Sequence, residues 1–102
     1  MSLLLDTHEP AVYLSPAPFW EITVKQSLGE LAAPKDLPAS IIGAGFRPLP
    51  ITAEHAIVAG RLPLLHRDPF DRMLIAQARC EGLTLVTRDP QIHRYDVALL
   101  LV

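Results

Sequence analysis

The sequence predicts an α/β fold in which a central, mostly parallel β-sheet is flanked by α-helices. Short, largely apolar runs at residues 3–5 and 83–86 have the composition of strands that are buried on both faces. Segments between these runs carry apolar residues at helical spacing. Strands that alternate with helices are typical of a parallel sheet covered on both faces. The 102 residues suffice for one domain with one modest core, which we assign to residues 1–102.

Composition limits the partners that the chain can attract. Hydrophobic residues make up 50% of the chain, and the formal net charge of −2 gives no general surface for polyanions. Any attraction to nucleic acid must therefore be local, from a bound cation and a few arginines. The single cysteine, Cys80, excludes an internal disulfide and a cysteine-based zinc site. No segment has the pattern of a signal peptide or a membrane span, so we expect a cytoplasmic protein.

The connection between the first two predicted strands is too short for a parallel pair. The strand at residues 3–5 ends in Asp6, and the strand at residues 11–14 ends before Ser15. Only four residues separate Asp6 from the second strand, whereas a parallel crossover needs about a dozen. Either the two strands are antiparallel, or a segment after about residue 8 is shortened or missing. We favour the second alternative, because the rest of the chain has the pattern of a crossover fold.

The middle of the chain is rich in proline and is predicted to hold short elements. A helix is expected to start near Phe19, which places Glu21 in its first turn, where the helix dipole favours a negative charge. An inward line along this helix would be formed by Trp20, Val24, Leu28 and Leu31. Beyond it we expect a linker at residues 34–38, a short helix at residues 37–42 and a short or edge strand at residues 49–51.

Two further helices are predicted in the second half. Thr52 is the N-cap of a helix over residues 53–62, with Ile57 and Val58 inward. Asp68 and Pro69 begin the next helix, an N-cap followed by a residue that needs no N–H in the first turn. That helix extends to about Glu81, Gly82 stops it, and the remaining elements are a strand at residues 83–86, a turn at residues 91–95 and a strand at residues 97–102.

Asp71 heads an apolar stripe, because Leu74, Ile75 and Ala78 follow it at helical spacing. Carboxylates are rarely buried unless they are paired, hydrogen-bonded or bound to a metal. Taken alone, an acid in this place is ordinarily part of a capping box. The ordinary alternatives elsewhere are an ion pair between Glu21 and Lys25 and a turn or N-cap at Asp89.

The joint placement of four acids favours a metal site. Ligands of open α/β sheets bind beyond the carboxyl ends of the strands, and we expect Asp6, Glu21, Asp71 and Asp89 to converge there. Clustered carboxylates repel one another unless cations or protons intervene. Ligation by oxygen alone selects Mg²⁺ or Mn²⁺. A pair of such ions about 4 Å apart would stabilise both reacting oxygens of a phosphodiester displacement.

Four segments in order, LLLDTH, YLSPAPFWEI, RDPFDRMLIAQA and LTLVTRDP, resemble PIN-domain ribonucleases of the VapC toxin type. The resemblance implies a PIN fold, Mg²⁺- or Mn²⁺-dependent cleavage of RNA, a homodimer and a cognate VapB-like antitoxin. It implies that Asp6, Asp71 and Asp89 hold metal and that Glu21 binds metal or orients water. Ser15 and Thr87 match hydroxyl positions near the pocket of that family and would bond acids or phosphate.

Two departures from that family leave an alternative open. The helical segment that usually follows LLLDTH is absent, and Pro18 stands where a small polar residue is common. A catalytically inactive PIN-like module that binds antitoxin or RNA is therefore the second hypothesis. A metal-dependent phosphomonoesterase is a weaker third, since the chain lacks the paired DxD motif.

Two arginines, the four histidines and two apolar stretches have further predicted roles. Arg72 and Arg88 flank acids, so either could bind an RNA phosphate, although solvated charge is the ordinary role. The four histidines show no metal spacing; His55 is interpreted as a helix-surface residue and His66 as a loop residue. Apolar surface near residues 20–31 and 57–65 is expected to receive an antitoxin helix or a second copy of the chain.

Overall fold

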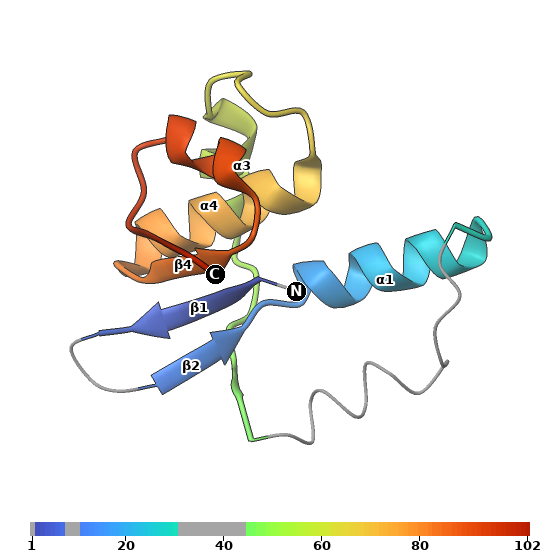
Figure 1. The fold of residues 1–102 in the computed structure, drawn as a ribbon, viewed down its shortest axis with the longest axis horizontal. Helices are drawn as coiled ribbons and strands as arrows, with labels where there is room; N and C mark the ends of the chain where they lie inside the picture. The colour runs from blue at the N-terminus through green and yellow to red at the C-terminus, as the bar shows by residue number, and fades with distance from the viewer. Residues whose placement is uncertain (1, 8–10, 31–44) are drawn as a thin grey trace.

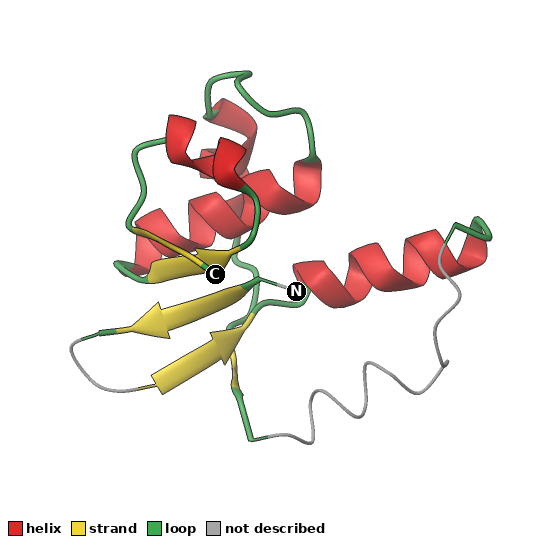
Figure 2. Ribbon diagram, viewed as in Figure 1, coloured by secondary structure: helices red, strands yellow, loops and turns green. Residues whose placement is uncertain are grey.

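The computed structural model describes residues 2–7, 11–30 and 45–102, which contain both strands and helices (Figure 2). The strands are β1 (Leu3–Asp6), β2 (Ala11–Leu14), β3 (Arg47–Pro48), β4 (Thr84–Thr87) and β5 (Leu99–Leu101). The helices are α1 (Ala17–Ser27), α3 (Ala53–Arg61), α4 (Pro69–Glu81) and the 3₁₀ helix η1 (Pro90–Arg94). The linker and short helix predicted at residues 34–38 and 37–42 lie outside the described residues.

The strands form one sheet in the order β3-β2-β1-β4-β5. The predicted α/β class is confirmed, but the sheet is mixed and not mostly parallel. Strand β1 is antiparallel to both β2 and β4, whereas β2 is parallel to β3 and β4 to β5. A connection of four residues allows a hairpin but no crossover. Of the two alternatives for this connection, the antiparallel one is what the structure shows; that the segment is shortened relative to the family stays a prediction.

The direction of β1 decides which strand ends share an edge of the sheet. Leu3 lies opposite Val86 and Leu5 opposite Thr84, so the start of β1 lies beside the end of β4. Figure 1 shows the β1 arrow pointing away from the beginning of α1, whereas β2 points toward it. The carboxyl ends of β2 and β4 therefore share one edge, and Asp6 lies toward the other.

Helix α4 is the centre of the core, as its sequence predicts. Asp68 caps it, with its carboxylate accepting from the backbone N–H of Phe70, and Gly82 ends it in the left-handed conformation. The predicted apolar stripe is buried against the sheet and the C-terminal segment, in one cluster of Leu4, Leu62, Leu74, Ile75, Ala78, Leu83, Leu85, Ile92 and Tyr95.

Helix α1 contacts the rest of the molecule mainly through its N-terminal end and projects beyond the sheet (Figure 1). It begins at Ala17, two residues before the predicted start, so Glu21 lies beyond its first turn. The predicted inward line is wrong at Trp20 and Leu28, which are 60% and 66% exposed, whereas Leu31 lies outside the described residues. Only Ala17 and Pro18 of this helix are buried.

Helix α3 has the predicted N-cap but buries a different face. Ile57 is 51% exposed, whereas His55, predicted at the surface, is 1% exposed. The His55 ring accepts from the Thr52 backbone N–H, the Thr52 hydroxyl accepts from the His55 N–H, and His55 Nε2 lies 3.1 Å from a Glu81 carboxylate oxygen. This reciprocal cap explains why a polar ring is buried there.

Among the described residues, none of the helices has the length and apolar character of a membrane span.

Arg72 does not contribute to a phosphate site, contrary to the sequence-based prediction, because its side chain is buried beneath α3. Its guanidinium donates to the carbonyl oxygens of Ala59, Leu62 and Pro63 at 2.8, 2.9 and 3.0 Å. Carbonyls at the C-terminal end of a helix carry the negative end of its dipole. Within the described residues no carboxylate forms an ion pair with Arg72, so carbonyl oxygens stabilise this buried charge.

Replacement of Arg72 is expected to destabilise the fold. Arg72→Met removes the hydrogen bonds from the guanidinium to the three carbonyl oxygens and should cost about 2–4 kcal/mol of unfolding free energy. Urea denaturation measures this loss. Arg79→Met is the matched control, because Arg79 is an exposed arginine of the same helix and should change stability by less than about 0.5 kcal/mol. Equal stability of the two variants would contradict the stabilising role of Arg72.

Candidate metal centre

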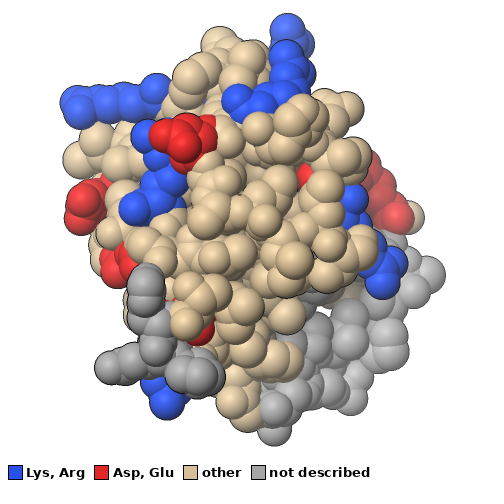
Figure 3. Space-filling view, turned by 60° about the vertical axis from the view of Figure 1, so that its left-hand side comes forward, with Lys and Arg blue, Asp and Glu red and all other residues tan. Residues whose placement is uncertain are grey.

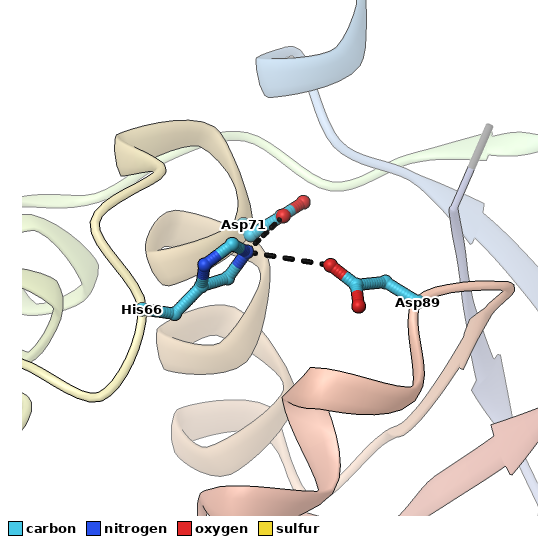
Figure 4. Close-up of side chains that lie close together, drawn as sticks. All are labelled: His66, Asp71 and Asp89. Carbon is cyan, nitrogen blue, oxygen red and sulfur yellow. Dashed lines mark hydrogen bonds and ion pairs between the residues drawn. The ribbon is translucent and has the colours of Figure 1, made fainter.

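Three side chains from separate parts of the second half of the chain meet at one point (Figure 4). His66 comes from the loop before α4, Asp71 from the first turn of α4, and Asp89 from the connection between β4 and η1. His66 Nε2 lies 2.7 Å from Asp71 Oδ2 and 3.4 Å from Asp89 Oδ2. One ligand atom of each residue lies within 4.8 Å of the others.

Local capping interactions position both acids. Asp68 Oδ1 accepts from the N–H groups of Phe70 and Asp71, which fixes the first turn that carries Asp71. Asp89 Oδ1 accepts from the Gln91 N–H and so caps η1, while its Oδ2 faces His66. Asp89 is therefore both the N-cap of η1 and a neighbour of His66 and Asp71.

A pocket of about 350 Å³ opens beside these acids. It lies between α1, α4 and the end of β4 and is lined by Ser2, Pro18, Glu21, Ile22, Asp71, Leu74, Thr87, Arg88 and Asp89. Glu21 thus reaches the predicted place and also forms the ordinary ion pair with Lys25, at 3.0 Å. This neighbouring carboxylate raises the pKa of the exposed Lys25 ammonium.

Asp6 does not reach this pocket, so the predicted convergence of four acids is wrong for Asp6. Ser2 lines the pocket, and four residues of extended chain from Ser2 to Asp6 span about 13 Å. Asp6 lies opposite Ala11 at the other end of β1. The cause is the antiparallel direction of β1, which turns its carboxyl end away from the carboxyl end of β4.

Of the residues predicted to lie near the phosphate, Thr87 and Arg88 line the pocket, whereas Ser15 does not. The buried Ser15 hydroxyl accepts from the Ala17 N–H at the start of α1, and Ser15 does not line the pocket. Thr87 lines the pocket, where its hydroxyl oxygen accepts from the Asp89 N–H and from the Ser2 hydroxyl. Arg88 is exposed at the pocket, as a phosphate contact requires.

His66 is the residue that the sequence interpretation missed. It does lie in a loop, as predicted, but its ring contacts both acids. Its spacing of five residues from Asp71 crosses a helix start, so no periodicity links the two. Only the tertiary arrangement of the loop, α4 and η1 brings the imidazole to the acids.

The surroundings of Asp71 raise its pKa above the usual range. Burial is the largest cause, because it disfavours the charged form, and the charge of Asp68 adds to it. The hydrogen bond from His66 opposes this shift by stabilising the carboxylate. A carboxylate held in this way has more to gain from a cation than an exposed one.

The donor set fits a divalent cation. Neighbouring ligands of an octahedral ion with bonds of about 2.1 Å are separated by about 3 Å. The His66–Asp71 and His66–Asp89 distances of 2.7 and 3.4 Å lie on either side of that value. Two carboxylates suit Mg²⁺ and Mn²⁺, and an added imidazole shifts the set toward transition metals.

Asp71→Asn is expected to raise the Tm of the metal-free protein at neutral pH. A carboxyl whose pKa is higher in the folded state than in the unfolded state lowers stability once the pH allows the unfolded chain to ionise. The advantage of the variant should therefore be absent below the unfolded-state pKa of about 3.9, grow as the pH rises from there toward the higher folded-state pKa, and stay constant above it. Asparagine retains an oxygen that can accept the His66 hydrogen bond.

Thermal unfolding in EDTA at a series of pH values measures this difference between the variant and the wild type. A wild type that is more stable than Asp71→Asn at neutral pH would contradict the expected effect of burial on this carboxyl.

Comparison with known families agrees with this geometry. The family model of the PIN domain matches residues 3–98. Searches for similar curated proteins and for similar solved structures find no match. PIN domains are typically nucleases that use divalent metals, in keeping with the cluster of His66, Asp71 and Asp89. The match spans nearly the whole chain, which therefore belongs to the PIN domain family.

Proposed function

We propose that this protein is a metal-dependent endoribonuclease that hydrolyses RNA phosphodiester bonds, and that it acts as the toxin of a toxin–antitoxin pair. The observation that carries the nuclease proposal is the convergence of His66, Asp71 and Asp89 beside a pocket in a PIN domain. The choice of RNA and the toxin role are supported by the resemblance of four segments to VapC-type ribonucleases.

In this proposal Asp71, Asp89 and His66 hold one Mn²⁺ or Mg²⁺ ion. A bound cation would stabilise charge on the phosphate oxygens and lower the pKa of an attacking water. The pair of ions expected from four acids loses its support, because Asp6 lies at the far end of β1. The imidazole favours Mn²⁺ over Mg²⁺.

The chain's own residues supply the other parts of the reaction. Glu21 faces the same pocket with a side chain that is 25% exposed, where its carboxylate can orient a water and accept its proton. The Arg88 guanidinium, exposed at the pocket, attracts the phosphate. Thr87 holds the backbone of Asp89 through its hydroxyl and so maintains the ligand geometry.

Two aspartate variants test the site. With Mn²⁺, Asp71→Asn should lower the rate of RNA cleavage about 100-fold or more, because it removes a ligand of the cation. Asp6→Asn should leave the rate within about twofold, because Asp6 lies about 13 Å along β1 from the pocket residue Ser2. The assay follows the appearance of 5′-phosphate ends on RNA. Full activity of Asp71→Asn would overturn the proposal.

A catalytically inactive module that binds antitoxin or RNA is the second candidate. The observation in its favour is the position of Asp6, which deprives the pocket of one acid that the family resemblance places there. Titration of the wild type with Mn²⁺ separates the two candidates. An inactive module without a cation site would show neither saturable binding nor a rise in Tm, whereas the nuclease should show both.

We further propose that a VapB-like antitoxin covers exposed apolar residues, and that two copies of the chain form a homodimer. Large hydrophobic residues are exposed on α1 and near α3, namely Trp20, Leu28, Ile51, Ile57 and Leu64. Figure 3 shows one face of the molecule, on which Lys, Arg, Asp and Glu lie mostly toward the rim. Exposed apolar side chains such as those on α1 and near α3 suit an amphipathic helix.

Co-expression with the small protein encoded beside the toxin gene tests the antitoxin proposal. We expect the two chains to copurify, and Leu28→Glu to weaken the complex, because it places a charge on the apolar surface. Glu30→Gln, an exposed change nearby, is the control. Separation of the wild-type chains during purification would contradict the proposed partner.

A further inference from the structure

We infer that Tyr95 is a positioning residue for the cation site: its hydroxyl, together with Arg72, holds the His66 loop so that the imidazole faces Asp71 and Asp89. This inference rests on the proposed function, because it supposes that the three residues bind a divalent cation. Tyr95 forms no hydrogen bond or ion pair with either acid, so its influence must pass through the loop.

The Tyr95 hydroxyl is used as both an acceptor and a donor within one loop. It accepts from the His66 backbone N–H at 2.8 Å and donates to the Pro63 carbonyl at 2.7 Å. The ring is 5% exposed and belongs to the hydrophobic core cluster, so the hydroxyl projects from a fixed support. Two hydrogen bonds from one rigid side chain hold both ends of the segment from Pro63 to His66.

Arg72 binds the same loop. Its guanidinium donates to the Pro63 carbonyl at 3.0 Å and approaches the His66 carbonyl and the Tyr95 hydroxyl at 3.4 Å. The N–H and the carbonyl group of His66 are thus both bound by side chains. Arg72 directly follows Asp71 in α4. The same helical turn therefore carries one of the proposed ligands, Asp71, and the side chain that holds the loop of another, His66.

The segment that carries the third proposed ligand, Asp89, also contacts the His66 loop. Asp89 caps η1, and that short helix leads directly to Tyr95. Arg94, the last residue of η1, donates to the Leu65 carbonyl at 3.0 Å. The segment that carries Asp89 therefore also anchors the loop that carries His66. A shift of the loop would separate the imidazole from both carboxylates, which makes the anchors a requirement for cation affinity.

A double-mutant cycle on Mn²⁺ affinity separates positioning from a purely structural role. Tyr95→Phe removes one oxygen and keeps the ring in the core. We expect it to weaken Mn²⁺ binding to the full chain about tenfold, the range found for groups that orient metal ligands. In the His66→Ala background, where Asp71 and Asp89 remain, Tyr95→Phe should change the Kd by less than about twofold, because no imidazole is left to position.

Tyr13→Phe is the matched control. Tyr13 also packs against the core, and its hydroxyl forms no hydrogen bond in the described part of the chain. This variant should bind Mn²⁺ as the wild type does. Isothermal titration gives the four dissociation constants of the cycle and that of the control, and circular dichroism verifies the fold of each variant.

The outcomes distinguish the positioning role of Tyr95 from the proposed nuclease function. Wild-type Mn²⁺ binding with an unchanged Kd in Tyr95→Phe would overturn the positioning role and leave the proposed function intact. The same holds if Tyr95→Phe weakens binding equally with and without His66. A wild type without saturable Mn²⁺ binding would overturn the proposed function and this inference with it.

Discussion

The constraint on which the rest of the structure depends is the four-residue connection after Asp6. It can close a hairpin but cannot cross over the sheet, so β1 runs antiparallel to β2, and in the sheet it is also antiparallel to β4. Because β1 is antiparallel to β4, the start of β1, and not its end, lies beside the end of β4. Ser2 then reaches the pocket beside Thr87, and Asp6 is carried to the opposite edge. The candidate metal centre is consequently built from the second half of the chain.

That second half supports its site with hydrogen bonds between α4, η1 and the loop before α4. Asp71 and Arg72 are neighbours in the helix, yet their side chains leave it in different directions. The carboxylate reaches the pocket, and the guanidinium reaches the carbonyl groups of the loop before the helix. Because Tyr95, directly after η1, bonds the same loop, one network of hydrogen bonds links the segments that carry His66, Asp71 and Asp89.

The predictable parts of this protein are those set by nearby residues. Helix α4 followed from Asp68, Pro69, the apolar period and Gly82, all within fifteen positions. The positions of Asp71 and Asp89 followed from the same local rules. His66 and Arg72 could not be assigned, since their partners come from other segments. The direction of β1 relative to β2 could be predicted from the length of their connection alone. That length is stronger evidence than the family pattern, because the number of residues limits the distance that a connection can span. Trp20 was misplaced because helical spacing predicts a face but not what covers it.

The charge of the candidate site favours one divalent cation over two. Four converging carboxylates would have carried a formal charge of −4, which favours a pair of divalent ions. In the structure Asp6 is elsewhere and Glu21 is paired with Lys25, leaving Asp71 and Asp89 with a formal charge of −2 beside an imidazole. A single divalent ion would balance that charge. The position of Asp6 therefore changes the expected site from two metal ions to one, with His66 as the third candidate ligand.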